Sequence, residues 1–116
     1  MTVEKCIIVE GRSDKLKIEP IFAEDVTILC TNGTISEDDL LDLLEPFEQH
    51  ELYTLFDADN SGEKLRKLTR RTYSEAVHLL IPRTYIEVAN APSKVLAHIL
   101  NEARFVVHKQ YLTLPE

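Results

Sequence analysis

The chain has 116 residues, of which 44% are hydrophobic, and its formal net charge is −7. This length and composition predict one globular domain over residues 1–116, with no room for a second catalytic domain. The negative charge argues against a general nucleic-acid coat protein, because such proteins bind by neutralising phosphates with basic side chains.

The N-terminal third of the chain alternates apolar and amphipathic segments. Residues 5–9 predict a first strand, and residues 13–19 predict a helix that ends or kinks at Pro20. Residues 26–31 predict a second strand, which the turn pair Asn32-Gly33 closes.

The middle of the chain contains the clearest helical pattern. Ser36 is suited to cap this helix, with Asp39 three residues further on. The apolar positions that follow recur at i, i+3, i+4 and i+7, as on one face of a helix, and they are Leu40, Leu43, Leu44 and Phe47. Residues 52–56 predict a third strand, and residues 61–71 predict a helix with a thin apolar side and a basic outer side.

The C-terminal third continues the alternation. Residues 76–81 predict a fourth strand, and Pro92 is placed as at the start of a helix. The buried stripe expected for that helix is Leu96, Ile99, Leu100 and Ala103. Residues 105–114 predict a short edge strand.

The order of strand then helix, repeated about four times, predicts an α/β fold. We expect three Rossmann-like layers, with a mainly parallel sheet of about four strands and helices on both faces. Right-handed crossovers place the carboxyl ends of parallel strands along one edge of the sheet. The sheet order 2-1-3-4 makes the first and third strands neighbours and puts a switch point between them, where such sheets bind ligands.

Acids followed by glycine stand at the ends of two predicted strands. Glu10 and Gly11 follow the first strand, and Asp57 and Asp59 follow the third strand, with Gly62 shortly behind. Carboxylates at i and i+2 of an extended chain point to the same side. Such oxygen ligands suit Mg²⁺ and leave coordination positions for substrate phosphates.

Both acidic motifs resemble those of a known family. Residues 7–14 (IIVEGRSD) and 56–62 (FDADNSG) resemble the two signature motifs of the Toprim (topoisomerase-primase) domain, which topoisomerases, bacterial primases, recombination mediators and several nucleases share. Residues 31–34 (TNGT) further resemble the ribosomal-RNA maturation nucleases of that superfamily and small stand-alone bacterial Toprim proteins. Ala58 stands where the family often has proline, a position that supplies no ligand.

The resemblance implies a Toprim fold and Mg²⁺-dependent phosphodiester chemistry on RNA or DNA, as in a small nuclease, with Mn²⁺ as a substitute ion. It assigns Glu10 as general acid or base and as a metal contact, and Asp57 and Asp59 as metal ligands. Asp14 is either a further acid of this site or a first-turn acid that faces the helix dipole.

A candidate phosphate-binding or nucleic-acid-binding set surrounds these acids. Five of the 13 basic residues fall between positions 64 and 71, and glycines at the motifs let the backbone approach a phosphate. The set is Gly11, Arg12, Lys15, Ser61, Gly62, Lys64, Lys67, Arg70 and Arg71. The alternative is that the basic stretch is only the solvated face of a surface helix. Arg83 and Lys94 are too loosely placed to assign.

Other interpretations of the same residues remain. The stretch from Asp57 to Gly62 fits the first half of a calcium-binding loop, but its twelfth position is Leu68 and a strand precedes it. The aspartates can also form a simple turn and helix cap, and Glu10 can be a solvated carboxylate at a strand end. At the level of function, the alternatives are a non-catalytic Toprim module that binds nucleic acid, a nucleotide or a protein partner, and a small-molecule phosphatase or kinase-like role. A nuclease with few contacts would call for a protein partner or a homo-oligomer.

Nothing in the sequence indicates a membrane or secretory segment. No apolar run approaches the roughly 20 residues of a membrane span, and residues 1–5 do not resemble the start of a signal peptide. We therefore expect a cytoplasmic protein with no membrane contact. Cys6 and Cys30 lie in apolar strand-like runs without a CxxC pair, which predicts buried free thiols rather than a zinc site.

Overall fold

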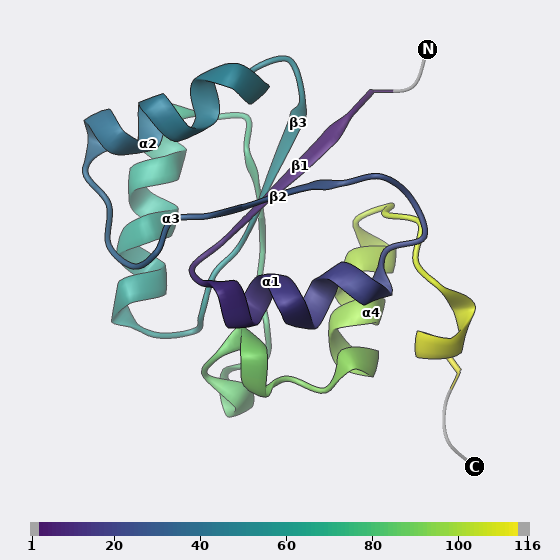
Figure 1. Ribbon diagram of the computed structural model, residues 1–116. Coiled ribbons are helices and arrows are strands. Elements are labelled where there is room, and N and C mark those ends of the chain that lie inside the picture. Colours follow the sequence, from purple (N-terminus) through teal and green to yellow (C-terminus); the bar gives the residue numbers. More distant parts are fainter. Residues whose placement is uncertain (1–2, 114–116) are drawn as a thin grey trace.

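The computed structural model describes residues 3–113 and contains one four-stranded sheet in which all paired strands are parallel (Figure 1). The strands are β1 (Lys5–Val9), β2 (Thr27–Cys30), β3 (Glu51–Leu55) and β4 (Val77–Leu79). Their order is β2-β1-β3-β4, as predicted. β1 pairs with β3 in a register that sets Cys6 opposite Leu52, so the two strands end side by side.

Four α-helices cover the sheet in two pairs, one pair on each face (Figure 1). The helices are α1 (Arg12–Ile18), α2 (Glu37–Leu44), α3 (Asn60–Thr72) and α4 (Ser93–Glu102). α1 and α4 lie on one face, and α2 and α3 lie on the other. This arrangement confirms the three-layer α/β fold.

The core has one half on each face of the sheet. β1 is a central strand, and Cys6, Ile7, Ile8 and Val9 are all 0% exposed, which explains why its sequence is continuously apolar. Its side chains alternate between the two halves, because successive residues of a strand point to opposite faces. Ile7 and Val9 pack with α1 and α4, while Cys6 and Ile8 pack with α2 and α3.

Local sequence signals explain most helix boundaries. The Ser36 hydroxyl accepts a hydrogen bond from Asp39 N at 3.1 Å and so caps α2. α1 ends at Ile18, and the chain continues through Pro20 as a 3₁₀ turn, Glu19–Ile21, as expected where proline removes a helical donor. Pro92 directly precedes α4 and occupies its N-cap position.

Two sequence expectations need correction near the C-terminus. The fourth strand was predicted over 76–81, but β4 covers only Val77–Leu79. The edge strand predicted over 105–114 is absent from its described part, where Val107 forms a single antiparallel bridge with Phe22 and a 3₁₀ turn follows at Lys109–Tyr111. Residue 114 lies outside the described residues.

Two further expectations from the sequence concern membrane-spanning helices and the cysteines. No helix within residues 3–113 has the length and apolar character that crossing a membrane requires. Both cysteines are free thiols, but Cys6 is fully buried while Cys30, on the edge strand β2, is only half-buried. Burial raises the pKa of the Cys6 thiol to about 12, so this thiol stays protonated and inert.

Candidate metal and nucleic-acid site

The acids that follow β1 and β3 meet at the carboxyl edge of the sheet. Because the two strands are parallel neighbours, Glu10 and Asp57 emerge next to each other. The backbone N–H of Asp57 donates a hydrogen bond to Glu10 Oε2 at 2.7 Å. The predicted proximity of Glu10 to the aspartate motif is therefore present in the structure.

The Glu10 carboxyl lies in a half-buried and negative environment. Its pKa is raised to about 7, chiefly because burial disfavours the charged form; the hydrogen bond from Asp57 N opposes the rise, and the carboxyl groups of Asp57 and Asp59 add to it. A group of this kind exchanges a proton near neutral pH, which is the property that a general acid or base requires.

A backbone N–H fixes one oxygen of each motif acid. Glu10 accepts from Asp57 N, Asp57 Oδ1 accepts from Val88 N at 2.8 Å, and Asp59 Oδ1 accepts from Gly62 N at 2.8 Å. Within residues 3–113, no backbone N–H donates to the second oxygen of any of the three acids. A backbone donor thus holds one oxygen of each acid in place, and no backbone donor in this range occupies the other oxygen.

A pocket of about 250 Å³ lies where Glu10 and Asp57 meet. It contains two segments that the sequence analysis singled out, the first acidic motif and the Asn32-Gly33 turn. Its lining residues are Glu10, Gly11, Ser13, Asp14, Asn32, Gly33, Asp57, Glu87 and Ala89. We call it the acidic pocket, since every charged residue in its lining is a carboxylate.

Asp14 belongs to this pocket and is 5% exposed. Its Oδ2 accepts from Gly11 N at 3.0 Å, so it also serves the first turn of α1. Burial raises the pKa of Asp14, hydrogen bonds from the backbone of Gly11 and Ala89 lower it, and the nearby Asp57 and Glu87 carboxylates add to the rise. Both roles considered for Asp14 therefore fit its position.

Glu87 is a member of the acidic pocket that the sequence analysis missed. It lies in an irregular segment between β4 and α4, where no strand or helix period marks it. The segment is tied to the aspartate motif because Ala58 N donates to Ile86 O at 2.6 Å and Val88 N donates to Asp57. Ile86 has φ 61°, a left-handed backbone that a branched residue seldom adopts and that sequence rules do not predict.

Asp59 has a different position from the other acids. It is the N-cap of α3 and lines a neighbouring pocket rather than the acidic pocket. Within the described part of the chain, no group of three or more His, Cys, Asp or Glu side chains is arranged to hold a metal ion. The metal site predicted from three acids thus stays a prediction. Glu10 and Asp57 line the acidic pocket, whereas Asp59 lines the neighbouring pocket.

The donor set nevertheless fits Mg²⁺. This ion keeps several waters and is usually bound by one or two carboxylates together with substrate phosphates, rather than by an all-protein cage. Glu10 and Asp57 supply two adjacent carboxylates. Burial and, to a lesser extent, the neighbouring carboxylates raise the pKa of Glu10, and a bound cation would favour its charged form.

Only one of the two motif glycines is required by its surroundings. A Cβ at Gly62 would lie 1.9 Å from the carbonyl oxygen of Asp57, so glycine lets α3 pack directly against the aspartate motif. A Cβ at Gly11 would meet nothing nearer than Asp14 Oδ2 at 3.9 Å, and its φ of −143° is open to any residue. Contacts within the described chain therefore do not require glycine at position 11.

The basic residues of α3 separate into an outer and an inner set. Lys64, Lys67, Arg70 and Arg71 are exposed along the outer side of the helix. We call these four residues the basic face. Arg66 points inward and is 7% exposed; its Nη1 donates to Asp57 O at 3.1 Å, and its Nε and Nη2 donate to Glu63. The basic face thus lies on the same helix that Asp59 caps.

The remaining predicted phosphate contacts differ in position. Ser61 is exposed in the first turn of α3, and Arg12 is exposed in the first turn of α1, close to the acidic pocket in sequence. Lys15 instead lines a separate pocket with Glu19 and Glu24, away from the acidic pocket. The structure therefore brings Gly11, but not Lys15, to the acidic pocket.

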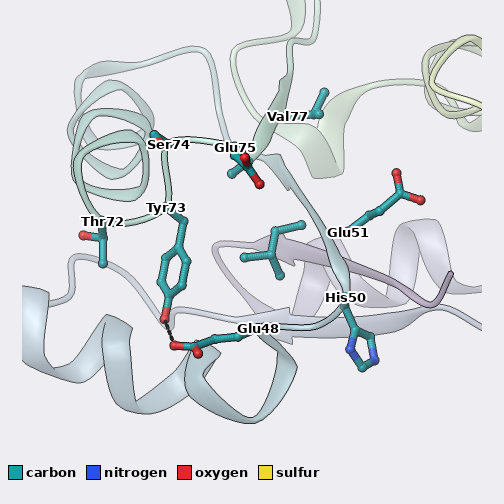
Figure 2. A pocket seen from close by; sticks show the side chains of 10 residues that line it. Glu48, His50, Glu51, Thr72, Tyr73, Ser74, Glu75 and Val77 are labelled. Atoms are coloured by element: carbon teal, nitrogen blue, oxygen red, sulfur yellow. Dashed lines mark hydrogen bonds between the residues drawn. The ribbon is translucent and has the colours of Figure 1, made fainter.

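Another pocket, of about 490 Å³, is at the opposite edge of the sheet, where β3 and β4 begin (Figure 2). Glu48, Glu51 and Glu75 line it, and Figure 2 shows Tyr73 pointing toward Glu48, to which its hydroxyl donates at 3.3 Å. Its one lining residue with a basic side chain is His50, which pairs with Glu4 at 3.0 Å. This carboxylate-rich lining is unsuited to phosphate.

Comparisons with known proteins agree with this geometry. The family model described as the Toprim domain matches residues 5–89, which include both acidic motifs, the Asn32-Gly33 turn and the Glu87 segment. The uncharacterized protein YusF of Bacillus subtilis (strain 168) is 48% identical over 110 residues, which are 95% of this chain and 75% of that protein.

Two further relatives carry more specific descriptions. Ribonuclease M5 of Bacillus subtilis (strain 168) is 34% identical over 88 residues, which are 72% of this chain but only 44% of the ribonuclease. A solved structure described as a small TOPRIM domain protein from Bacillus stearothermophilus is 50% identical, with a TM-score of 0.93 over all of this chain and 98% of that chain.

Proposed function

Because this chain belongs to the Toprim domain family, we propose that it is a small Mg²⁺-dependent nuclease that hydrolyses phosphodiester bonds in RNA or DNA. The observation that carries the proposal is the contact between Glu10 and Asp57, which sets an acid with a pKa of about 7 beside a second carboxylate at the carboxyl edge of the sheet. Similarity to ribonuclease M5 over part of that enzyme makes RNA the first substrate to test.

Each acid has a role that follows from its surroundings. Glu10 and Asp57 would hold the ion, with Asp59 contributing from the start of α3. Bound Mg²⁺ supplies charge neutralisation at a phosphate oxygen and a bound water of lowered pKa. Glu10 is the candidate for moving a proton, because its carboxyl has a pKa of about 7 without the ion; in that role its protonated form would compete with ion binding. Backbone donors hold Glu10 and Asp57 side by side, so little reorganisation of these two acids would be needed when substrate arrives.

The basic face supports a polyanionic substrate. Four exposed cations on α3 begin at Lys64, five residues after Asp59, so a strand whose phosphate reaches the acids can lay its neighbouring phosphates along the helix. The chain as a whole has a net charge of −7, so a basic face of four residues would by itself bind nucleic acid weakly. A protein partner or a homo-oligomer would add further contacts with the nucleic acid.

The second candidate is a Toprim module that binds nucleic acid, a nucleotide or a protein partner without cutting. It is favoured by the position of Asp59, whose carboxylate caps α3 and lines another pocket than Glu10. In this case the acids would serve binding and structure only.

One experiment separates the two candidates. Purified protein is incubated with labelled single-stranded, duplex and structured RNA and DNA in Mg²⁺ and in Mn²⁺, beside the Glu10→Gln variant. Cleavage by the wild type that the variant loses supports the nuclease. Salt-sensitive binding without cleavage in either ion supports the module, and cleavage that survives in Glu10→Gln contradicts the assigned site.

A further inference from the structure

A second pocket, of about 340 Å³, adjoins the aspartate motif and is not explained by metal binding. Consecutive residues of one segment line the two pockets, Asp57 the acidic pocket and Ala58 and Asp59 the second. Its full lining is Phe56, Ala58, Asp59, Asn60, Glu63, Arg66, Leu80, Ile81 and Arg83. We call it the arginine pocket.

The arginine pocket and the acidic pocket differ in charge. The lining acids Asp59 and Glu63 are balanced by Arg66 and Arg83, so its formal charges cancel, whereas the acidic pocket is lined by carboxylates alone. A phosphate gains little from such a balanced lining. An uncharged ligand with polar edges is better suited to it.

The polar groups of the arginine pocket have unused hydrogen-bonding capacity. Arg66 carries five N–H donors, and Nε, Nη1 and Nη2 make one hydrogen bond each, to Glu63 and to Asp57 O, which leaves two N–H groups. Arg66 is 7% exposed, and these bonds hold its guanidinium in a fixed orientation. Among the described residues, Arg83 forms no ion pair and its side chain makes no hydrogen bond.

The rim and wall of the same pocket are apolar. Leu80 is 63% exposed and is the most exposed large hydrophobic residue of the described chain, while Phe56 and Ile81, which also line the pocket, are buried. The planar guanidinium of Arg83 can stack on a flat ring, and the aliphatic side chain of Leu80 can lie against the face of that ring as an apolar surface.

We propose that the arginine pocket binds an unpaired nucleobase of single-stranded nucleic acid, next to the phosphate that lies at Glu10 and Asp57. The base places its face on Leu80 and Arg83, and its polar edge accepts hydrogen bonds from Arg66. This inference rests on the proposed function for its substrate class, but it concerns base binding and requires neither metal nor cleavage. It makes Leu80 and Arg83, which the sequence did not mark, the residues that contact the base.

Nuclear magnetic resonance tests the pocket directly. The four nucleoside 5′-monophosphates and ribose 5-phosphate are titrated separately into the labelled protein in EDTA, and the amide signals of Asn60, Leu80 and Arg83 are followed. We expect at least one nucleotide to shift these signals while ribose 5-phosphate does not. Equal shifts with ribose 5-phosphate would identify a phosphate site, and no shift with any nucleotide would also overturn the proposal.

A matched pair of variants sharpens the test. Leu80→Ser should weaken the nucleotide Kd about fivefold or more, because it removes the apolar surface on which the base would lie. Leu41→Ser removes another exposed leucine, on α2, and should leave the Kd unchanged. An equal Kd in wild type and Leu80→Ser contradicts the base contact. Base binding without any nuclease activity would keep this inference and reject the proposed activity, and cleavage without base-dependent shifts would do the reverse.

Discussion

The backbone N–H of Asp57 donates to Glu10 Oε2 at 2.7 Å and joins two strand ends that are 47 residues apart. This bond forms because β1 and β3 are parallel neighbours and end side by side. It orients the carboxyl of Glu10, but it does not remove the charge crowding with Asp57 and Asp59 that contributes to the raised pKa.

The pH dependence of stability should reveal the raised pKa of Glu10. The pKa is about 7 in the folded protein, against an ordinary value near 4.5, so this group stabilises the fold fully below about pH 4.5 and the contribution is lost as pH rises through 7. Glu10→Gln keeps an oxygen acceptor for Asp57 N without the charge. In EDTA the variant should therefore match the wild type at pH 4.5 and exceed it at pH 8 by about 1 to 2 kcal/mol, a value reduced for partial solvent exposure. Urea unfolding at both pH values measures this, and equal stability at pH 8 would contradict the raised pKa.

Divalent ions should raise the melting temperature through the motif acids. At ten times its Kd, an ion that binds only the folded state adds about 1.4 kcal/mol, or several degrees in melting temperature for a domain of this size. Asp57→Asn should abolish most of the Mg²⁺ or Mn²⁺ shift, because Asp57 shares the acidic pocket with Glu10. Asp59→Asn should reduce the shift less, and asparagine still caps α3. The double variant should show none, and a full shift in it would place the ion elsewhere.

The fold was predictable because its signals are local and periodic. β1 was predicted at its observed bounds, and the cap at Ser36 was read from residue type and spacing alone. The sheet order followed from requiring Glu10 to meet the aspartate motif. The tail at 105–114 was not predictable in this way, since its apolar residues pack under the sheet through Phe105 and Val107 without forming a strand ladder.

The site was predictable only where strand ends place it. Glu10 and Asp57 follow from the topology, but the capping of α3 by Asp59 and the placing of Glu87 depend on the irregular segment around Ile86. Arg66 looked like one more cation of a basic helix, yet its helical phase turns it toward Asp57. Such assignments need the packing of α3 on the motif, which a sequence pattern does not specify.

Gly62 should be intolerant of a side chain, whereas Gly11 should tolerate one. In the interior of a helix, alanine is normally more favourable than glycine by about 1 kcal/mol. At position 62, however, the new Cβ would overlap the Asp57 carbonyl oxygen at 1.9 Å, so the net loss should be about 2 to 3 kcal/mol, with a weaker metal-induced shift in melting temperature. Gly11→Ala is the matched control, with its nearest contact at 3.9 Å. Because Gly11 is the N-cap of α1, where glycine is favoured over alanine, its loss should be about 1 kcal/mol or less. Urea unfolding of both variants decides, and equal losses would contradict the close packing of α3.

The basic face should determine the salt dependence of nucleic-acid binding. Each phosphate that a lysine or arginine neutralises contributes about 0.7 to the slope of log K against log salt for single strands. Replacing Lys67, Arg70 and Arg71 with alanine should therefore weaken binding at low salt and reduce the slope by about 2. The matched control replaces Lys17, Lys94 and Lys109, which changes net charge equally but lies outside α3. Fluorescence anisotropy with a labelled single-stranded oligonucleotide, across a salt series in EDTA, gives both slopes. A loss that is equal in the two triple variants would show that only net charge matters, and an unchanged slope in the α3 variant would make the basic face a solvated surface.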